Sequence, residues 1–209
     1  MTTSRSATIA HALPGRVRWD VPAIRNNATL CAALQRLLRL EGGITDAVAS
    51  DNGDNGIFAS IQGAEYADFF VGDLAVDDLD DVYDFIDDVG PWANEFPQGG
   101  VVASGNDAGG ILANLVSGTG DATVVASGTT ADDNGDDGIG FTRDASAGPG
   151  SALAYLFSTQ TLGNGDNDLY GTASSDSGNA FIFGTNLVYS SYSFFAQSTS
   201  GSSDIDVNP

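Results

Sequence analysis

Residues 44–62, ITDAVASDNGDNGIFASIQ, decide the fold expected for the first half of the chain. Two apolar runs, Ile44–Ser50 and Gly56–Gln62, flank the turn-forming stretch Asp51–Gly56, which contains two Asn-Gly steps. Asn and Gly readily adopt the left-handed backbone of tight turns, so this pattern predicts two antiparallel strands joined as a β-hairpin.

The segments around this hairpin predict a mixed α/β region over residues 15–106. Arg16–Ile24 alternates like a half-buried strand, and Leu30, Leu34, Leu37 and Leu38 then recur at helical spacing. Asp77–Val89 predicts a second helix with aspartates on one face, and Val101–Ser104 predicts a last strand. The order β-α-β-β-α-β is that of a ferredoxin-like fold, with the apolar stretch Tyr66–Val76 left open as an extra strand.

Residues 107–200 predict a β-rich region, because Gly, Ser, Thr, Asn and Asp punctuate short β-like runs. The expected strands are Thr123–Thr130, Gly138–Arg143, Ala152–Thr161, Leu169–Ser174, Ala180–Tyr189 and Tyr192–Ser198, with Ile111–Val116 as a short helical turn. No repeat is regular enough to predict a solenoid. The fold class expected is therefore α+β, mostly β, ending in an antiparallel β-sandwich or barrel. Residues 1–14 are expected to form an N-terminal arm and residues 201–209 a C-terminal tail.

The stretch Pro14-Gly15-Arg16-Val17-Arg18 and the leucine-rich segment after it loosely resemble heavy-metal-associated modules of ferredoxin-like fold. Those modules hold soft metals through a Cys-x-x-Cys loop, whereas Cys31 is the only cysteine of this chain. The resemblance therefore implies a fold and no metal-transfer role.

The charge is unusual in both its size and its distribution. The net charge is −21, there is no lysine, and aspartate supplies nearly all of the acid. Six of the seven arginines lie in the first forty residues, which carry about +5, while the remaining residues carry about −26. So acidic a body repels itself until salt screens it, which predicts a protein of a halophile or of its virus. The alternative is an extracellular protein loaded with calcium.

Three Asp- and Asn-rich turns are candidates for cation binding, because hard cations such as Ca²⁺ bind clusters of oxygen ligands. The candidate ligands are Asp51, Asp54, Asp133, Asp137, Asp144, Asp166 and Asp168. None of the turns fits the spacing of an EF-hand loop, and ordinary polar turns explain the same residues. No cofactor is expected beyond Ca²⁺ or bound monovalent cations.

The basic N-terminal segment predicts contacts between subunits. Arg16, Arg18, Arg36 and Arg39 complement the acidic body and are the candidate assembly residues. Nucleic acid is a disfavoured partner, because the acidic body would repel it and molar salt removes the counterion-release contribution to binding. The expected partners are copies of the chain and other structural proteins.

Catalytic chemistry is poorly supplied, with one histidine, one cysteine and no lysine. No apolar stretch is long enough for a membrane-spanning helix. The sequence favours a non-enzymatic structural subunit of a halophilic virion (capsid, decoration, turret or tail component), synthesised in the host cytoplasm. The alternative is a soluble Ca²⁺-binding or protein-binding module in the cytoplasm of a halophile.

Overall fold

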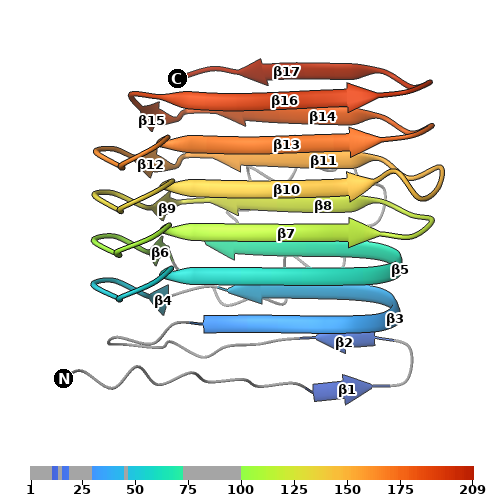
Figure 1. The fold of residues 1–209 in the computed structure, drawn as a ribbon, viewed down its shortest axis with the longest axis horizontal. Helices are drawn as coiled ribbons and strands as arrows, with labels where there is room; N and C mark the ends of the chain where they lie inside the picture. Colours follow the sequence, from blue (N-terminus) through green and yellow to red (C-terminus); the bar gives the residue numbers. More distant parts are fainter. Residues whose placement is uncertain (1–10, 14–15, 19–29, 45–46, 73–99) are drawn as a thin grey trace.

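The computed structural model describes residues 11–13, 16–18, 30–44, 47–72 and 100–209, and every regular element in them is a β-strand. The chain winds as a parallel β-solenoid, and each circuit is here called a rung (Figure 1). Two short strands, β1 (His11–Leu13) and β2 (Arg16–Arg18), precede the rungs. The six rungs contain, in order, β3 (Leu30–Ile44) and β4 (Ala47–Val48); β5 (Ile57–Gly72) and β6 (Val101–Val102); β7 (Ile111–Ser117), β8 (Ala122–Ser127) and β9 (Thr129–Thr130); β10 (Ile139–Ala145), β11 (Ala152–Phe157) and β12 (Gln160–Thr161); β13 (Leu169–Ser175), β14 (Ala180–Thr185) and β15 (Val188–Tyr189); and β16 (Tyr192–Ser198) and β17 (Ser203–Val207).

Stacking of the rungs produces three sheets around one core. The first sheet contains β7, β10, β13 and β16, the second contains β8, β11, β14 and β17, and the third contains β4, β6, β9, β12 and β15. The long strands β3 and β5 bend from the first sheet into the second, so the two sheets are hydrogen-bonded as one. All pairings are parallel except that of β1 with β2.

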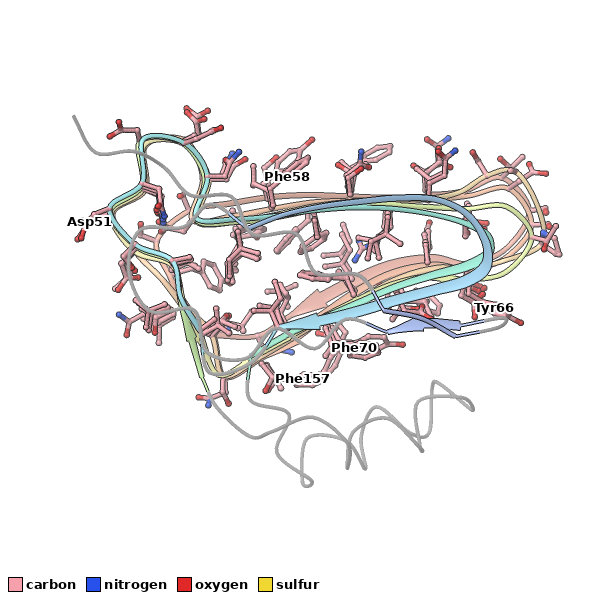
Figure 2. All side chains as sticks on the ribbon, turned by 90° about the horizontal axis from the view of Figure 1, so that it is seen from below. Asp51, Phe58, Tyr66, Phe70 and Phe157 are labelled. Carbon is pink, nitrogen blue, oxygen red and sulfur yellow. The ribbon has the colours of Figure 1, made fainter. Side chains whose placement is uncertain are left out.

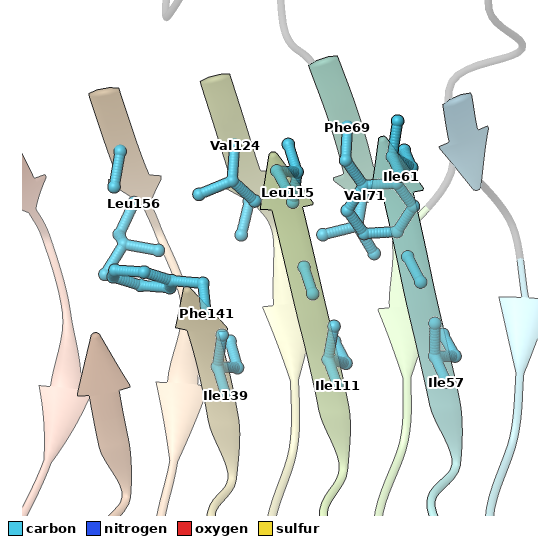
Figure 3. Packing of buried hydrophobic residues seen from close by; sticks show 14 of the residues in the cluster. Ile57, Ile61, Phe69, Val71, Ile111, Leu115, Val124, Ile139, Phe141 and Leu156 are labelled. Carbon is cyan, nitrogen blue, oxygen red and sulfur yellow. The ribbon is translucent and has the colours of Figure 1, made fainter. Parts of the chain in front are cut away.

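Equivalent residues of successive rungs lie in columns that run along the solenoid axis. Alternate residues of each strand point inward, so one column of the first sheet holds Ile57, Ile111, Ile139 and Leu169, all buried (Figure 3). The first inward column of the second sheet is made of Ala67, Ala122, Ala152 and Ala180, and it directly follows the bend between the two sheets. Both columns belong to one continuous core.

One inward column contains a pair of stacked rings with a glycine between them. Phe141, Gly171 and Phe194 are in register in three successive rungs. The rings of Phe141 and Phe194 stack with centroids 6.0 Å apart, and a Cβ on Gly171 would lie 2.0 Å from the Phe141 ring. Glycine is therefore required at this position for the two rings to approach.

The second sheet is buried on both of its faces in the middle of the solenoid. Its outward residues form a separate apolar cluster: Phe70, Val125, Leu153, Tyr155 and Phe157, with Phe181 and Phe183 packed against it. Both β8 and β11 consequently have no exposed residue. This double burial explains why Ala152–Phe157 is a continuous apolar run and does not alternate.

The predicted α+β class is wrong, because no βαββαβ unit and no antiparallel sandwich or barrel is present in the described residues. Leu30–Leu38, expected as a helix, belongs to β3, whose pairing with β5 shifts register near Leu37. Such shifts break the two-residue alternation of a strand, and leucines three and four apart then imitate a helix. Ile111–Val116, expected as a helical turn, is part of β7. The helix expected over Asp77–Val89 lies outside the described residues.

The predicted hairpin is also wrong. Residues 51–56 turn the chain from β4 in the third sheet to β5 in the first, and these two strands do not pair. Of the six strands expected after residue 120, three are confirmed, as β10, β13 and β16. The other three, Thr123–Thr130, Ala152–Thr161 and Ala180–Tyr189, each contain two strands that lie in different sheets. All of these strands pair in parallel with their counterparts in adjacent rungs. The last nine residues, expected to be a tail, contain β17. No helix in the described part of the chain could span a membrane.

Candidate functional site

The turns between the third and first sheets stack on one another and carry a ladder of asparagines. Asn52, Asn106, Asn134 and Asn164 occupy the same place in four successive turns, at the bend where Figure 2 shows Asp51. Each amide Nδ2 donates a hydrogen bond to the Oδ1 of the next asparagine, at 2.8, 2.8 and 2.9 Å. That Oδ1 also accepts the backbone N–H of the preceding asparagine, at 3.0–3.1 Å. The ladder thus satisfies buried polar groups that the sharp turns leave without backbone partners.

The ladder ends on a carboxylate. Asp168 Oδ1 accepts Nδ2 of Asn164 at 2.9 Å, and its Oδ2 accepts the backbone N–H groups of Ser190 and Ser191 at 2.7 and 3.1 Å. Burial alone would raise the pKa of Asp168, but the hydrogen bonds donated by Ser190 and Asn164 outweigh it and lower the pKa below 3.8. Because a carboxylate only accepts, Asp168 fixes the direction in which every amide of the ladder points.

In each turn from which the ladder continues to another asparagine, a glycine is the last residue before the strand of the first sheet. Gly138 illustrates the reason: a Cβ there would lie 2.6 Å from Nδ2 of Asn164. Asp168 replaces this glycine in the next turn, and its own carboxylate takes the place of a further asparagine. The ladder and its glycines therefore form one packing unit.

A second column of the same turns alternates aspartate and glycine. Asp51, Gly105, Asp133 and Gly163 all have a left-handed backbone, with φ of 57°, 69°, 56° and 73°. A Cβ on Gly105 would lie 2.8 Å from Oδ1 of Asp51, and one on Gly163 would lie 2.5 Å from Oδ1 of Asp133. Each aspartate side chain thus covers the glycine of the next rung, and no two carboxylates of this column are adjacent.

The remaining candidate cation ligands are dispersed. Asp137 Oδ1 accepts the backbone and side-chain N–H groups of Asn167 at 3.2 and 3.0 Å, and Asp54 accepts Nδ2 of Asn55 at 3.2 Å. Asp166 lies exposed in its turn, and Asp144 lies near the end of β10, where it accepts the backbone N–H of Ser146 at 2.9 Å. Within the described residues, no three His, Cys, Asp or Glu side chains are grouped to hold a metal ion.

The candidate assembly arginines belong to the N-terminal end of the solenoid. Arg16 and Arg18 lie in β2, Arg36 and Arg39 lie in β3, and these strands pair at Val17 and Leu40. Figure 1 shows β2 and β3 at the end of the solenoid opposite to β16 and β17. The uneven charge of the sequence is therefore distributed along the solenoid axis.

The C-terminal rung leaves the core open. Tyr192 continues the inward column of Leu169, yet it is 57% exposed whereas Leu169 is completely buried. Ile205, inward in the second sheet, is 40% exposed. Within the described residues, β16 pairs only with β13 and β17 only with β14, so one backbone edge of each strand is free. The result is an apolar end surface with unused hydrogen-bonding groups, here called the C-terminal end surface, formed by Tyr192, Phe194, Ala196, Ile205 and Val207.

Neither the asparagine ladder nor this surface was found from the sequence alone. The signal for the ladder is an asparagine inside similar turns, A-S-D-N-G-D-N-G at residues 49–56 and A-D-D-N-G-D-D-G at residues 131–138. The asparagines are separated by 54, 28 and 30 residues, which hides the repeat. The first separation includes residues 73–99, which lie outside the described part of the structure.

Comparison of the chain with protein-family models, with curated proteins and with solved structures gave no match. The architecture of the described residues is that of a parallel β-solenoid.

Proposed function

We propose that this chain is a non-enzymatic structural subunit, adapted to high salt, that joins copies of itself through its C-terminal end surface. The observation that carries the proposal is the exposure of Tyr192 at an inward position of the core. A large exposed apolar surface beside free strand edges is typical of an interaction site.

The distribution of charge supports a second copy as the occupant of this surface. The C-terminal rung carries Asp204 and Asp206 and no basic residue, whereas six of the seven arginines lie within the first forty residues. End-to-end contact brings these opposite charges together, and the apolar residues supply affinity when salt screens the charges. An interface between two different ends of the same molecule propagates into a ring or filament.

The setting we propose is the virion of a halophilic virus, in which the chain serves as a capsid, decoration, turret or tail component. The supporting features are the net charge of −21, the absence of lysine and the lack of varied catalytic side chains. The calcium-binding alternative gains no support, because the candidate carboxylates are dispersed over different turns and accept hydrogen bonds from N–H groups of the protein.

The test is the oligomeric state in about 3 M NaCl, where the Debye length is about 3 Å or less. Sedimentation over a dilution series is expected to show concentration-dependent growth of linear or closed assemblies. Tyr192→Ser and Ile205→Ser are expected to weaken association about tenfold or more. Val102→Ser removes an exposed apolar residue from β6 in the third sheet, away from the C-terminal end surface, and is expected to leave association unchanged. A wild-type chain that stays monomeric at every concentration would contradict the proposal.

A further inference from the structure

Arg143 lies inside the solenoid. Its position in β10 aligns with Leu115 of the preceding rung and with Ala173 of the next, and both of these are completely buried core residues. Arg143 itself is 0% exposed and is among the largest fully buried side chains in the described residues. A charged side chain has therefore been placed where the same column elsewhere holds apolar groups.

The guanidinium has fewer partners than it has donors. Nη2 donates to the backbone carbonyl of Thr172 at 3.1 Å, and the guanidinium carbon lies 4.2 Å from the centroid of the Phe141 ring. Nε and Nη1 are buried and have no hydrogen-bond partner. No carboxylate of the described residues forms an ion pair with Arg143.

Neither deprotonation of Arg143 nor ionisation of a neighbouring tyrosine removes the unpaired positive charge. Burial lowers the pKa of Arg143 well below its usual value, but a guanidinium keeps its proton in proteins. Burial, and then the charge of Asp121, raise the pKa of Tyr155 to about 12, so the Tyr155 hydroxyl stays neutral. A buried charge without a counter-ion is strongly disfavoured, and an apolar residue of similar size would ordinarily be preferred there.

Toward the C-terminal rungs and across the core, the residues near Arg143 are small. Ala173 and Ala196 follow Arg143 in the two C-terminal rungs of its column, and strand β11 places Ala152 and Ala154 inward. Because rungs are about 4.8 Å apart and Leu115 and Phe141 also border the guanidinium, a ligand there must be small.

We propose that the guanidinium of Arg143 binds one small monovalent anion, such as chloride, inside the solenoid. The anion neutralises the guanidinium and accepts N–H donors that have no partner in the protein, as charge-assisted hydrogen bonds require. Because the surrounding rungs enclose the site, the anion enters as the rungs stack and is retained by the folded state. Chloride then acts as a folding ligand, and its effect is separate from general screening of the acidic surface.

The first experiment measures urea-induced unfolding while chloride replaces gluconate at constant sodium concentration and ionic strength. For the wild type, the logarithm of the folding equilibrium constant is expected to rise with chloride concentration. Its slope in the logarithm of chloride concentration increases from zero, below the dissociation constant, to about one when the site in the folded state is saturated. Arg143→Met is expected to remove this dependence, and Leu115→Met, a matched change in the same column, is expected to preserve it. Arg143→Lys retains the charge without the planar fork and is expected to need several-fold more chloride.

The second experiment locates the ion in wild-type crystals grown in bromide. An anomalous peak within hydrogen-bonding distance of the guanidinium nitrogens of Arg143 is expected. Equal wild-type stability in chloride and gluconate overturns the proposal and indicates water as the partner of Arg143. An equal chloride response in wild type and Arg143→Met also overturns it, and so does a bromide map without a peak at the guanidinium.

Discussion

The direction of the asparagine ladder makes Asn134→Asp the most informative single change in this molecule. Asn134 is buried, accepts N–H and Nδ2 of Asn106 through its Oδ1, and donates Nδ2 to Oδ1 of Asn164 at 2.9 Å. The new carboxyl group keeps the shape and both accepted bonds. It places an oxygen, in place of a donor, against Oδ1 of Asn164.

The neighbouring amides cannot rotate to relieve this contact. If Asn164 turned its Nδ2 toward the new carboxylate, its Oδ1 would face Oδ1 of Asp168, which only accepts. The variant therefore loses one buried hydrogen bond and gains a buried charge beside an acceptor. Such losses cost about 2–4 kcal/mol, a large part of the 5–15 kcal/mol that stabilises a typical domain.

The assay is urea unfolding followed by circular dichroism at constant high salt, from pH 7 to pH 4.5. The folded state raises the pKa of the new carboxyl above its unfolded value near 3.9, because burial and the facing oxygen disfavour its charge. The loss of unfolding free energy relative to the wild type is therefore largest at pH 7. It becomes smaller as the pH falls, since the protonated carboxyl group donates a hydrogen bond to Asn164. Asn114→Asp adds the same charge at an exposed position of β7 and serves as the control. A pH-7 deficit equal to that of the control, or one that does not narrow on acidification, would refute the proposed ladder polarity.

Three further predictions concern packing and acid stability. Gly138→Ala is expected to cost about 2–4 kcal/mol in the same assay, because its Cβ would lie 2.6 Å from Nδ2 of Asn164, whereas Gly53→Ala, with 3.8 Å to the nearest atom, should cost under about 1 kcal/mol. Because the pKa of Asp168 is lowered in the folded state, its carboxylate stabilises the fold at pH values above its unfolded pKa near 3.9. This stabilisation is lost as the pH falls through the folded pKa. An Asp168→Asn variant that loses as much stability on acidification as the wild type would contradict this. Phe194→Ala, which removes the outer ring of the stacked pair, is expected to lower the unfolding free energy by about 2–4 kcal/mol, and a thermal scan showing no shift would argue against its packing role.

The sequence predicted individual strands better than their pairing. Turn-forming residues marked the ends of strands such as Leu169–Ser174, because tight turns need Gly, Asn and Asp wherever they occur. Pairing in a solenoid depends instead on similar turns that recur at the uneven spacings of 54, 28 and 30 residues, which hide the repeat. The same Asn-Gly steps suit a hairpin and a solenoid bend, so local chemistry alone could not separate the two architectures.

The prediction of candidate sites from the sequence failed for the same reason. Asp133 and Asp137 are close in sequence and looked like ligands of one ion, but rung stacking pairs each with residues of a neighbouring turn. Arg143 looked like an ordinary strand residue, because its inward direction depends on the register with Leu115. In a solenoid, therefore, the surroundings of a side chain are set by the rungs above and below it.

The alternation of Asp51, Gly105, Asp133 and Gly163 constrains how such a chain can change in length. Adjacent rungs lie about 4.8 Å apart, so carboxylates in this column are separated by roughly twice that distance. Excision of the rung that contains Gly105 would set Asp51 directly against Asp133, in a backbone conformation that gives their side chains the same direction. Duplication of the rung that contains Asp133 would create the same conflict. Relatives of different length should therefore differ by an even number of rungs, because rungs would be gained or lost in pairs.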